Sequence, residues 1–152
     1  MAAGNVTLYS RNKDDFRIND IVGATVKLLL VTSTYTPNTN ETTGHSVLAD
    51  ITNEIANGNG YTTGGFTLAS LTATAITGGF KFSSGNASWT ATGGSIPAWR
   101  YGILYVSGVL WGQTSPLLGY FVGDNTPADI PATTVGNTLT IYCPANGWFD
   151  IT

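Results

Sequence analysis

Two segments of the chain carry apolar side chains at both odd and even positions. They are Ala24–Thr32 (ATVKLLLVT) and Ala98–Val106 (AWRYGILYV). Because successive side chains of a β-strand point to opposite faces, each of these strands would be apolar on both faces. A strand of that kind belongs inside a core. The sequence therefore predicts two central strands that are covered on both sides.

Other segments alternate apolar with polar residues, which is typical of a strand with one face towards solvent. Leu139 and Ile141 alternate with Thr138, Thr140 and Tyr142. Glycine pairs and Asn-Gly steps separate the segments and supply the positive φ angles that tight turns need. The predicted strands are Val6–Leu8, Ala24–Thr32, Thr67–Ile76, Gly79–Phe82, Ala87–Thr92, Trp99–Ser107, Leu117–Val122, Thr138–Tyr142 and Trp148–Ile151.

Two kinds of strand indicate two stacked layers. We therefore expect an all-β fold, a β-sandwich or jelly-roll-like single domain over residues 1–152, with at most one or two short helical turns. Helical turns are expected only at Lys13–Ile18 and Ser46–Ile55, and irregular structure is the alternative for both. The polar runs Pro37–Gly44 and Gly123–Gly136 are expected to be loops.

Charged residues make up only 10% of the 152 residues, and the net charge is −3. Without a cluster of Lys and Arg to neutralise phosphates, we expect no nucleic-acid binding. The longest apolar run, Leu28–Val31, is too short to cross a bilayer, and the first residues show no signal-peptide pattern. No membrane association is expected.

The scarcity of charge also bears on assembly. Small neutral side chains lose little entropy when they are covered, and the centres of protein interfaces are depleted of charge. This composition favours lasting contact with neighbouring subunits, although neutral drift in a small protein would also produce it.

Few residues offer catalytic or metal-binding chemistry. His45 is the only histidine and lies beside a polar run, so we interpret it as a solvated loop residue. Cys143 is the only cysteine, which excludes an intrachain disulfide, and we interpret it as a buried or half-buried thiol. With one His and one Cys, a His-rich zinc site is excluded, and an all-carboxylate site is poorly supported. We predict no catalytic residues, no metal and no cofactor.

The acidic and glycine-rich motifs have structural explanations. Asp14 and Asp15 are adjacent, so their side chains diverge and make a poor acid/base couple. Asp124 and Asp129 lack the dense spacing of a calcium loop and are interpreted as turn formers. Residues Gly58–Gly65 look like a phosphate-binding loop, but no lysine or helix follows. We interpret this segment as a turn.

The aromatic residues are the remaining candidates. Trp89, Trp99 and Trp148 lie in predicted strands, where packing in the core is the default. Trp111 lies in a connection, in the sequence Gly108-Val109-Leu110-Trp111-Gly112. An exposed apolar tip often docks on a partner, while folding back onto its own domain is the alternative. We therefore select Val109, Leu110 and Trp111 as a possible protein-contact loop.

The chain resembles a family of small β-sandwich virion structural proteins of tailed bacteriophages. The block Asn53–Gly65, with Asn-Glu followed by Gly-Tyr-Thr-x-Gly-Gly, is the most specific part of the likeness. The other segments that carry it are Val26–Pro37, Ala98–Tyr105 and Pro116–Phe121. Two parts depart from the family pattern. Relatives have a clearer N-terminal helix than Lys13–Ile18, and the end Cys143–Trp148 is less typical.

The resemblance implies a virion component without catalytic activity, assembled in the host cytoplasm. We expect it to decorate or cement the capsid through contacts with capsid or other virion proteins, as a homo-oligomer such as a trimer. The alternative is a tail or fibre module that binds host surface glycans, for which exposed Trp or Tyr rings are required. A small enzyme is the third and least favoured hypothesis.

Overall fold

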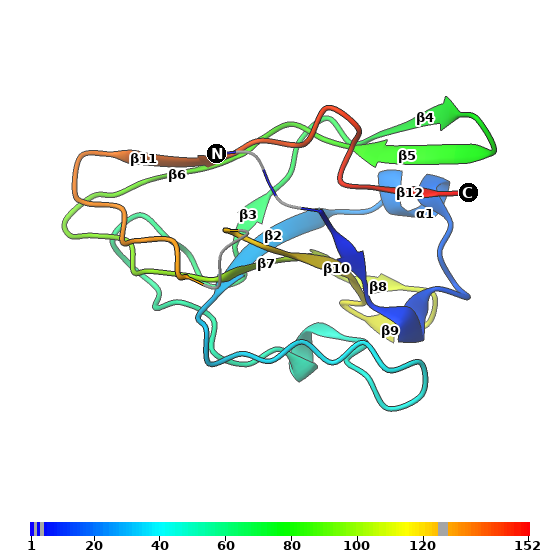
Figure 1. Cartoon of the computed structure of the whole chain (residues 1–152), viewed down its shortest axis with the longest axis horizontal. Helices are drawn as coiled ribbons and strands as arrows, with labels where there is room; N and C mark the ends of the chain where they lie inside the picture. The colour runs from blue at the N-terminus through cyan, green and yellow to red at the C-terminus, as the bar shows by residue number, and fades with distance from the viewer. Residues whose placement is uncertain (2, 4, 125–127) are drawn as a thin grey trace.

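The two segments predicted as central strands lie side by side in the computed structural model, which describes residues 1, 3, 5–124 and 128–152. Strand β2 (Val26–Val31) pairs antiparallel with β7 (Tyr101–Val106) in the middle of a five-stranded sheet. The order of that sheet is β1-β10-β7-β2-β3 (Figure 1). The outer strands of the sheet are β1 (Thr7–Leu8), β10 (Leu117–Val122) and β3 (Phe66–Thr67).

Each central strand is buried on both faces, which confirms the prediction from the sequence. Leu28 and Leu30 belong to one core, while the intervening Leu29 and the following Val31 belong to a second core on the other face. All four are fully buried. The central sheet therefore has no face towards solvent at β2.

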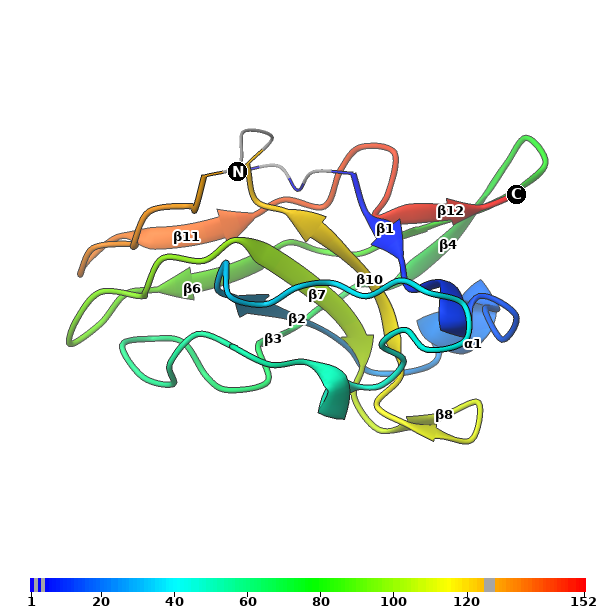
Figure 2. The same cartoon turned by 60° about the horizontal axis from the view of Figure 1, so that its bottom comes forward.

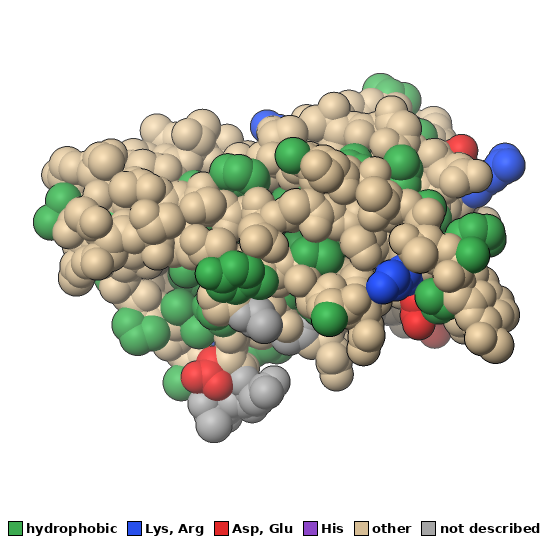
Figure 3. Space-filling view, turned by 90° about the horizontal axis from the view of Figure 1, so that it is seen from above, with side chains coloured by type: hydrophobic (Ala, Val, Ile, Leu, Met, Phe, Trp, Pro, Cys, Tyr) green, Lys and Arg blue, Asp and Glu red, His purple; other side chains and the backbone are tan. Residues whose placement is uncertain are grey.

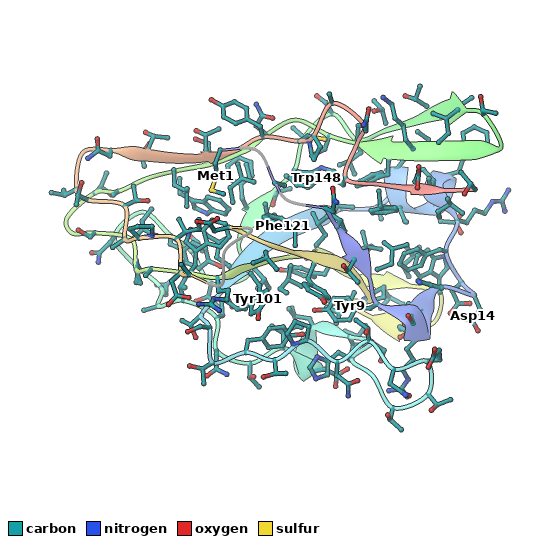
Figure 4. The ribbon with its side chains drawn as sticks, in the orientation of Figure 1. Met1, Tyr9, Asp14, Tyr101, Phe121 and Trp148 are labelled. Carbon is teal, nitrogen blue, oxygen red and sulfur yellow. The ribbon has the colours of Figure 1, made fainter. Side chains whose placement is uncertain are left out.

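The first core lies between the central sheet and a second layer of strands (Figure 2). That layer contains the pair β11-β6 and the three-stranded sheet β12-β5-β4. Figure 4 shows Phe121 and Trp148 on this side of the sheet, and their rings stack with centroids 5.9 Å apart. The strands of this layer are β4 (Thr72–Ile76), β5 (Gly79–Ser83), β6 (Ala87–Thr90), β11 (Thr138–Ile141) and β12 (Phe149–Ile151). The fold is all-β and sandwich-like, as predicted.

The second core is closed by residues 32–52, here called the covering segment, which runs along the opposite face of the central sheet (Figure 2). Its one regular element is the short 3₁₀ helix η2 (Leu48–Asp50). Tyr35 inserts from this segment and is 1% exposed, and Ile51 packs against the same core. The predicted loop Pro37–Gly44 has no helix or strand and lies within this covering segment. Residues on either side of it, such as Tyr35 and Ile51, contribute to the second core.

One predicted helical turn, Lys13–Ile18, was misplaced, whereas the other, Ser46–Ile55, contains a short helix. Residues 13–15 form a turn, and the helices on either side are the 3₁₀ helix η1 (Ser10–Asn12) and α1 (Ile18–Val22). Helix α1 begins after Arg17 because Ile18 and Ile21 bury one side of it against the second layer. In Ser46–Ile55 only Leu48–Asp50 is helical.

Three further differences concern strands and loops. The predicted strand Thr67–Ile76 is divided, because Ser70 adopts φ +54° between β3 and β4. A short hairpin of β8 (Val109–Leu110) and β9 (Gln113–Thr114) was not predicted. Within the predicted loop Gly123–Gly136, residues 125–127 lie outside the described residues, and Ile130 pairs with Trp99. No helix in the described part is long and apolar enough to span a membrane.

Candidate functional site

The predicted contact loop Val109–Trp111 forms one strand and the turn of the β8–β9 hairpin. Trp111 and Gly112 take φ angles of +53° and +72° at the turn. Val109 is 73% exposed, whereas Leu110 and Trp111 are half-buried. The hairpin thus presents one exposed apolar side chain, Val109.

The ring of Trp111 is turned back onto its own domain. It stacks on Phe16 with ring centroids 5.4 Å apart and an interplanar angle of 30°. Its indole Nε1 donates a hydrogen bond of 3.1 Å to Asp20 Oδ2. The sequence left open whether this ring docks on a partner or folds back onto its own domain, and in the structure it folds back. The exposed apolar residue of the loop is Val109.

Phe16 connects this hairpin to an apolar groove of about 340 Å³. The groove runs between the start of α1 and the ends of β5 and β12, and its lining residues are Phe16, Arg17, Ile18, Asn19, Phe80 and Ile151. Phe80 is 51% exposed. Figure 1 places the β8–β9 hairpin, α1, β12 and the β4–β5 hairpin at the same end of the molecule. We call this end, with Val109, Phe16, Phe80 and Ile151, the contact end.

No local pattern in the sequence marks the groove. Phe16 and Phe80 lie in segments far apart in the chain and meet only through the packing of α1 under β5. Phe80 follows Gly78-Gly79 in a predicted strand, where an aromatic residue is most simply explained as core. Its exposure becomes visible only when β5 is seen to extend beyond the first core.

Charged side chains are few and separated on the face formed by the second layer (Figure 3). Thr90 and Thr138 form a cross-strand hydroxyl pair at 2.9 Å on β6 and β11. Ser88 and Thr140 form the next pair at 3.4 Å. This part of the surface therefore consists of short neutral side chains whose hydroxyl groups are already paired with one another.

His45 is half-buried and hydrogen-bonded, which corrects its interpretation as a solvated loop residue. A hydrogen bond of 2.8 Å joins its Nδ1 to the hydroxyl of Tyr35, and another of 2.8 Å joins that hydroxyl to the hydroxyl of Tyr9. The covering segment is thereby attached to the sheet side of the core. Asn12 adds to the attachment by donating from Nδ2 to the carbonyls of Ser46 and Leu117 at 2.7 and 2.9 Å.

Ionisation of this cluster follows from its burial. Burial raises the pKa of Tyr35 to about 12, and burial together with the hydrogen bond to Tyr35 raises the pKa of Tyr9 far above its ordinary value. Burial alone would also raise the pKa of Asp50. The backbone N–H groups of Ser46 and Val47, which donate to its Oδ2, outweigh that effect and hold its pKa below the usual value.

The glycine-rich block is organised around a carboxylate of its own chain. Glu54 Oε1 accepts hydrogen bonds of 2.7 Å from the Tyr61 hydroxyl and from the backbone N–H of Gly64. Tyr61 in turn accepts from the backbone N–H of Leu30 in β2 at 3.1 Å. Gly65 lies so close to β2 that an added Cβ would be 2.0 Å from the Leu28 carbonyl oxygen. The motif is thus a structural turn attached to the central sheet.

The remaining candidates for chemistry do not converge. Asp14 and Asp15 lie exposed in a turn. Asp129 accepts from Arg100 Nε at 2.8 Å in a salt bridge. Cys143 is half-buried, and burial raises the pKa of its thiol. Among the residues that the structure describes, no group of three or more His, Cys, Asp or Glu could hold a metal ion.

The tryptophans offer no platform for stacking against a sugar. Trp89, Trp99 and Trp148 are at most 5% exposed, as predicted for core residues, and Trp111 is occupied by Phe16. In the described residues, the large aromatic side chains exposed by half or more are Phe80 and Tyr142. Phe80 lies in β5, and Tyr142 follows the end of β11.

Comparisons of the chain with protein-family models, with curated proteins and with solved structures each found no match.

Proposed function

We propose that this chain is a non-enzymatic structural protein of a tailed-bacteriophage virion, where it decorates or cements the capsid. The starting point is the resemblance carried by Val26–Pro37 and Asn53–Gly65. The role is mechanical: many copies cover neighbouring capsid subunits and raise the free energy needed to separate them. Multivalent attachment of a homo-oligomer, such as a trimer, would strengthen the effect without new contacts.

The observation that carries the proposal is how the polar groups are used. Three side chains that could act as acids or bases are hydrogen-bonded within the chain: His45 to Tyr35, Glu54 to Tyr61, and Asp20 to Trp111. What β6 and β11 of the second layer offer to a partner is short, neutral and paired. A surface of that kind supports contact with another protein better than it supports bond-making or bond-breaking.

The contact end supplies the apolar part of such an interface. Val109 and Phe80 are exposed apolar side chains at this end, and Phe80 lines the groove together with Phe16. Burial of apolar surface stabilises by about 25 cal/mol per Å² before the costs of association are subtracted. A modest contact therefore becomes effective when it is repeated over a shell.

The test is to add the purified protein to capsids from which it has been stripped and to measure their resistance to heat. Rebinding and restored resistance are expected for the natural chain, and V109S should weaken both while its own unfolding temperature stays unchanged. T134S, a change at an exposed loop residue on another part of the chain, is the matched control. The protein's absence from purified particles would overturn the proposal, and so would binding to host glycans with no binding to capsids.

A further inference from the structure

The sheet edges of this protein are covered unequally. Residues 1 and 3 cover β11: the Met1 carbonyl accepts from Tyr142 N–H at 2.7 Å, and Ala3 N–H donates to the Tyr142 carbonyl at 3.3 Å. Strands β1 and β3, at the two edges of the central sheet, have only two residues each. Strand β4 is the longest edge strand of the described residues, with five residues, and it lies at the outer margin of the molecule (Figure 1).

The backbone groups that β4 turns outward can be identified from its neighbours. The Phe82 carbonyl accepts from Trp148 N–H at 2.8 Å, so the backbone of Phe82 faces β12. Alternate residues of an antiparallel strand face opposite neighbours. Ala73 and Ala75, which lie opposite Phe82 and Phe80, therefore direct their N–H and C=O groups away from β5. No backbone hydrogen bond from another described segment reaches them.

This edge lacks the features that usually prevent pairing with another strand. Proteins protect exposed edges with charged side chains, proline, bulges or very short strands. The sequence of β4, Thr-Ala-Thr-Ala-Ile, has no charge and no proline, and its pairing with β5 is regular over all five residues. The edge is thus open to a strand that matches it.

We propose that β4 of a second copy of this chain supplies that strand, so that two copies pair antiparallel through β4. Thr74 of one copy lies opposite Thr74 of the second copy, and the outward groups of Ala73 bond those of Ala75 in each direction. The two three-stranded sheets β12-β5-β4 become one sheet of twice the width. Only this register, or one shifted by an even number of residues, lets the outward groups of both copies meet.

The side chains of β4 suit the pairing. On one face Thr72 of each copy lies opposite Ile76 of the other, and such β-branched pairs stabilise adjacent strands. On the other face the small Ala73 and Ala75 leave space beside the half-exposed ring of Phe80. No charge of either copy is placed at the new strand boundary.

The contact is small, since one short strand pair buries less than the roughly 1,000 Å² expected of a stable interface. We therefore expect a weak dimer that forms at high concentration and is favoured where many copies are held together. This inference concerns the isolated protein and does not depend on its place in a virion. A dimer in solution with no capsid binding would overturn the proposed function alone.

The first test is disulfide trapping. Thr74 and its copy form a non-hydrogen-bonded antiparallel pair. In such a pair the Cα atoms of opposite residues are about 4.5 Å apart, within the range that a disulfide spans. In a C143S background, T74C should form a linked dimer under mild oxidation. S88C in the same background is the control, because Ser88 is exposed on β6, a strand of a different sheet that lies outside the proposed contact. Equal cross-linking of the two variants would overturn the proposal.

The second test exchanges charge at the same position. T74K and T74E should each shift the protein from dimer to monomer in sedimentation at high concentration, because two like charges then face each other. Mixing the two variants should restore a heterodimer, and S88K should leave the dimer intact. If T74K remains as dimeric as the natural chain, or if the natural chain is monomeric at every concentration or trimeric, the proposed pairing is wrong. Unfolding curves of each variant show whether the monomer is folded.

Discussion

The ring of Phe121 in β10 lies over the α-carbon of Gly102, its partner on the neighbouring strand β7. A Cβ added at residue 102 would lie 2.3 Å from the nearest ring carbon. The ring cannot move aside easily, because it packs edge-on against Trp99 and stacks on Trp148. The centre of the first core thus depends on the absence of one methyl group.

We therefore predict that G102A destabilises the fold by about 1–3 kcal/mol, the usual cost of overpacking a core. Urea unfolding followed by tryptophan fluorescence measures this. G23A is the matched control, because Gly23 has φ −77° and an added Cβ there would make only ordinary contacts at 3.6 Å. A G102A protein as stable as the natural chain would contradict the packing described.

Removal of the Glu54 carboxylate should loosen the block 53–65. E54A leaves the buried hydroxyl of Tyr61 and the N–H of Gly64 without their shared acceptor, and we expect a loss of about 1–3 kcal/mol. E54Q keeps an acceptor oxygen and should lose less. E41A, at an exposed residue, should change stability by less than about 0.5 kcal/mol. Chemical unfolding of the three variants gives the order, and an E54A value no larger than that of E41A would contradict it.

Alkaline pH should unfold the protein through its buried phenols. Burial raises the pKa of Tyr35 and Tyr105 to about 12, whereas an unfolded tyrosine titrates near 10. Between those values the unfolded chain has lost protons that the folded chain keeps. Stability is therefore complete below about pH 10 and falls as the pH rises towards 12. Thermal melts across this range, with phenolate absorbance, measure the effect.

The matched variant for this prediction is Y142F, which removes a half-exposed tyrosine and should leave the alkaline transition unchanged. Y105F removes a buried one and should make the decline less steep, although it also removes a 2.6 Å hydrogen bond to the Gly64 carbonyl. The slope against pH, rather than the absolute stability, is therefore the quantity to compare. Equal slopes for both variants would refute the assignment.

The two apolar residues of the contact loop should behave differently. W111A removes the stack on Phe16 and the bond to Asp20, and we expect a loss of about 1–3 kcal/mol of stability. V109A removes a side chain that is 73% exposed and should change stability little. Thermal unfolding of both variants checks this. A destabilised V109A protein would mean that the hairpin packs differently.

Much of the fold could be predicted because hydrophobic alternation is local information. The double-sided burial of Leu28–Val31 follows directly from four consecutive apolar residues. The covering segment could not be predicted in the same way, because it has almost no regular structure. It closes the second core with isolated insertions such as Tyr35 and with the bonds of Asn12, which leave no periodic pattern.

The candidate surface was predicted in part. Val109 was selected as a neighbour of Trp111 in a glycine-flanked connection, and of the three selected residues it is the exposed one. The indole of Trp111 could not be assigned, since its partner Phe16 is distant in sequence and no alternation links them. Phe80 was missed for the same reason. A groove between a helix and a strand is a property of tertiary packing.

The burial of β2 on both faces has a consequence for how the strands find their alignment. In a sheet with one buried face, a slip by one residue exposes the apolar side chains to solvent, and the cost of that exposure selects the correct pairing. Here the slipped strand would still present leucine and valine to both cores. Shape must therefore supply the selection. In the observed alignment a Cβ at residue 65 would clash with the Leu28 carbonyl oxygen, and a Cβ at residue 102 would clash with the ring of Phe121. This alignment therefore places a glycine at each of two positions that no other residue fits. In this protein, close packing at glycines selects the strand alignment that exposure to solvent selects in other sheets.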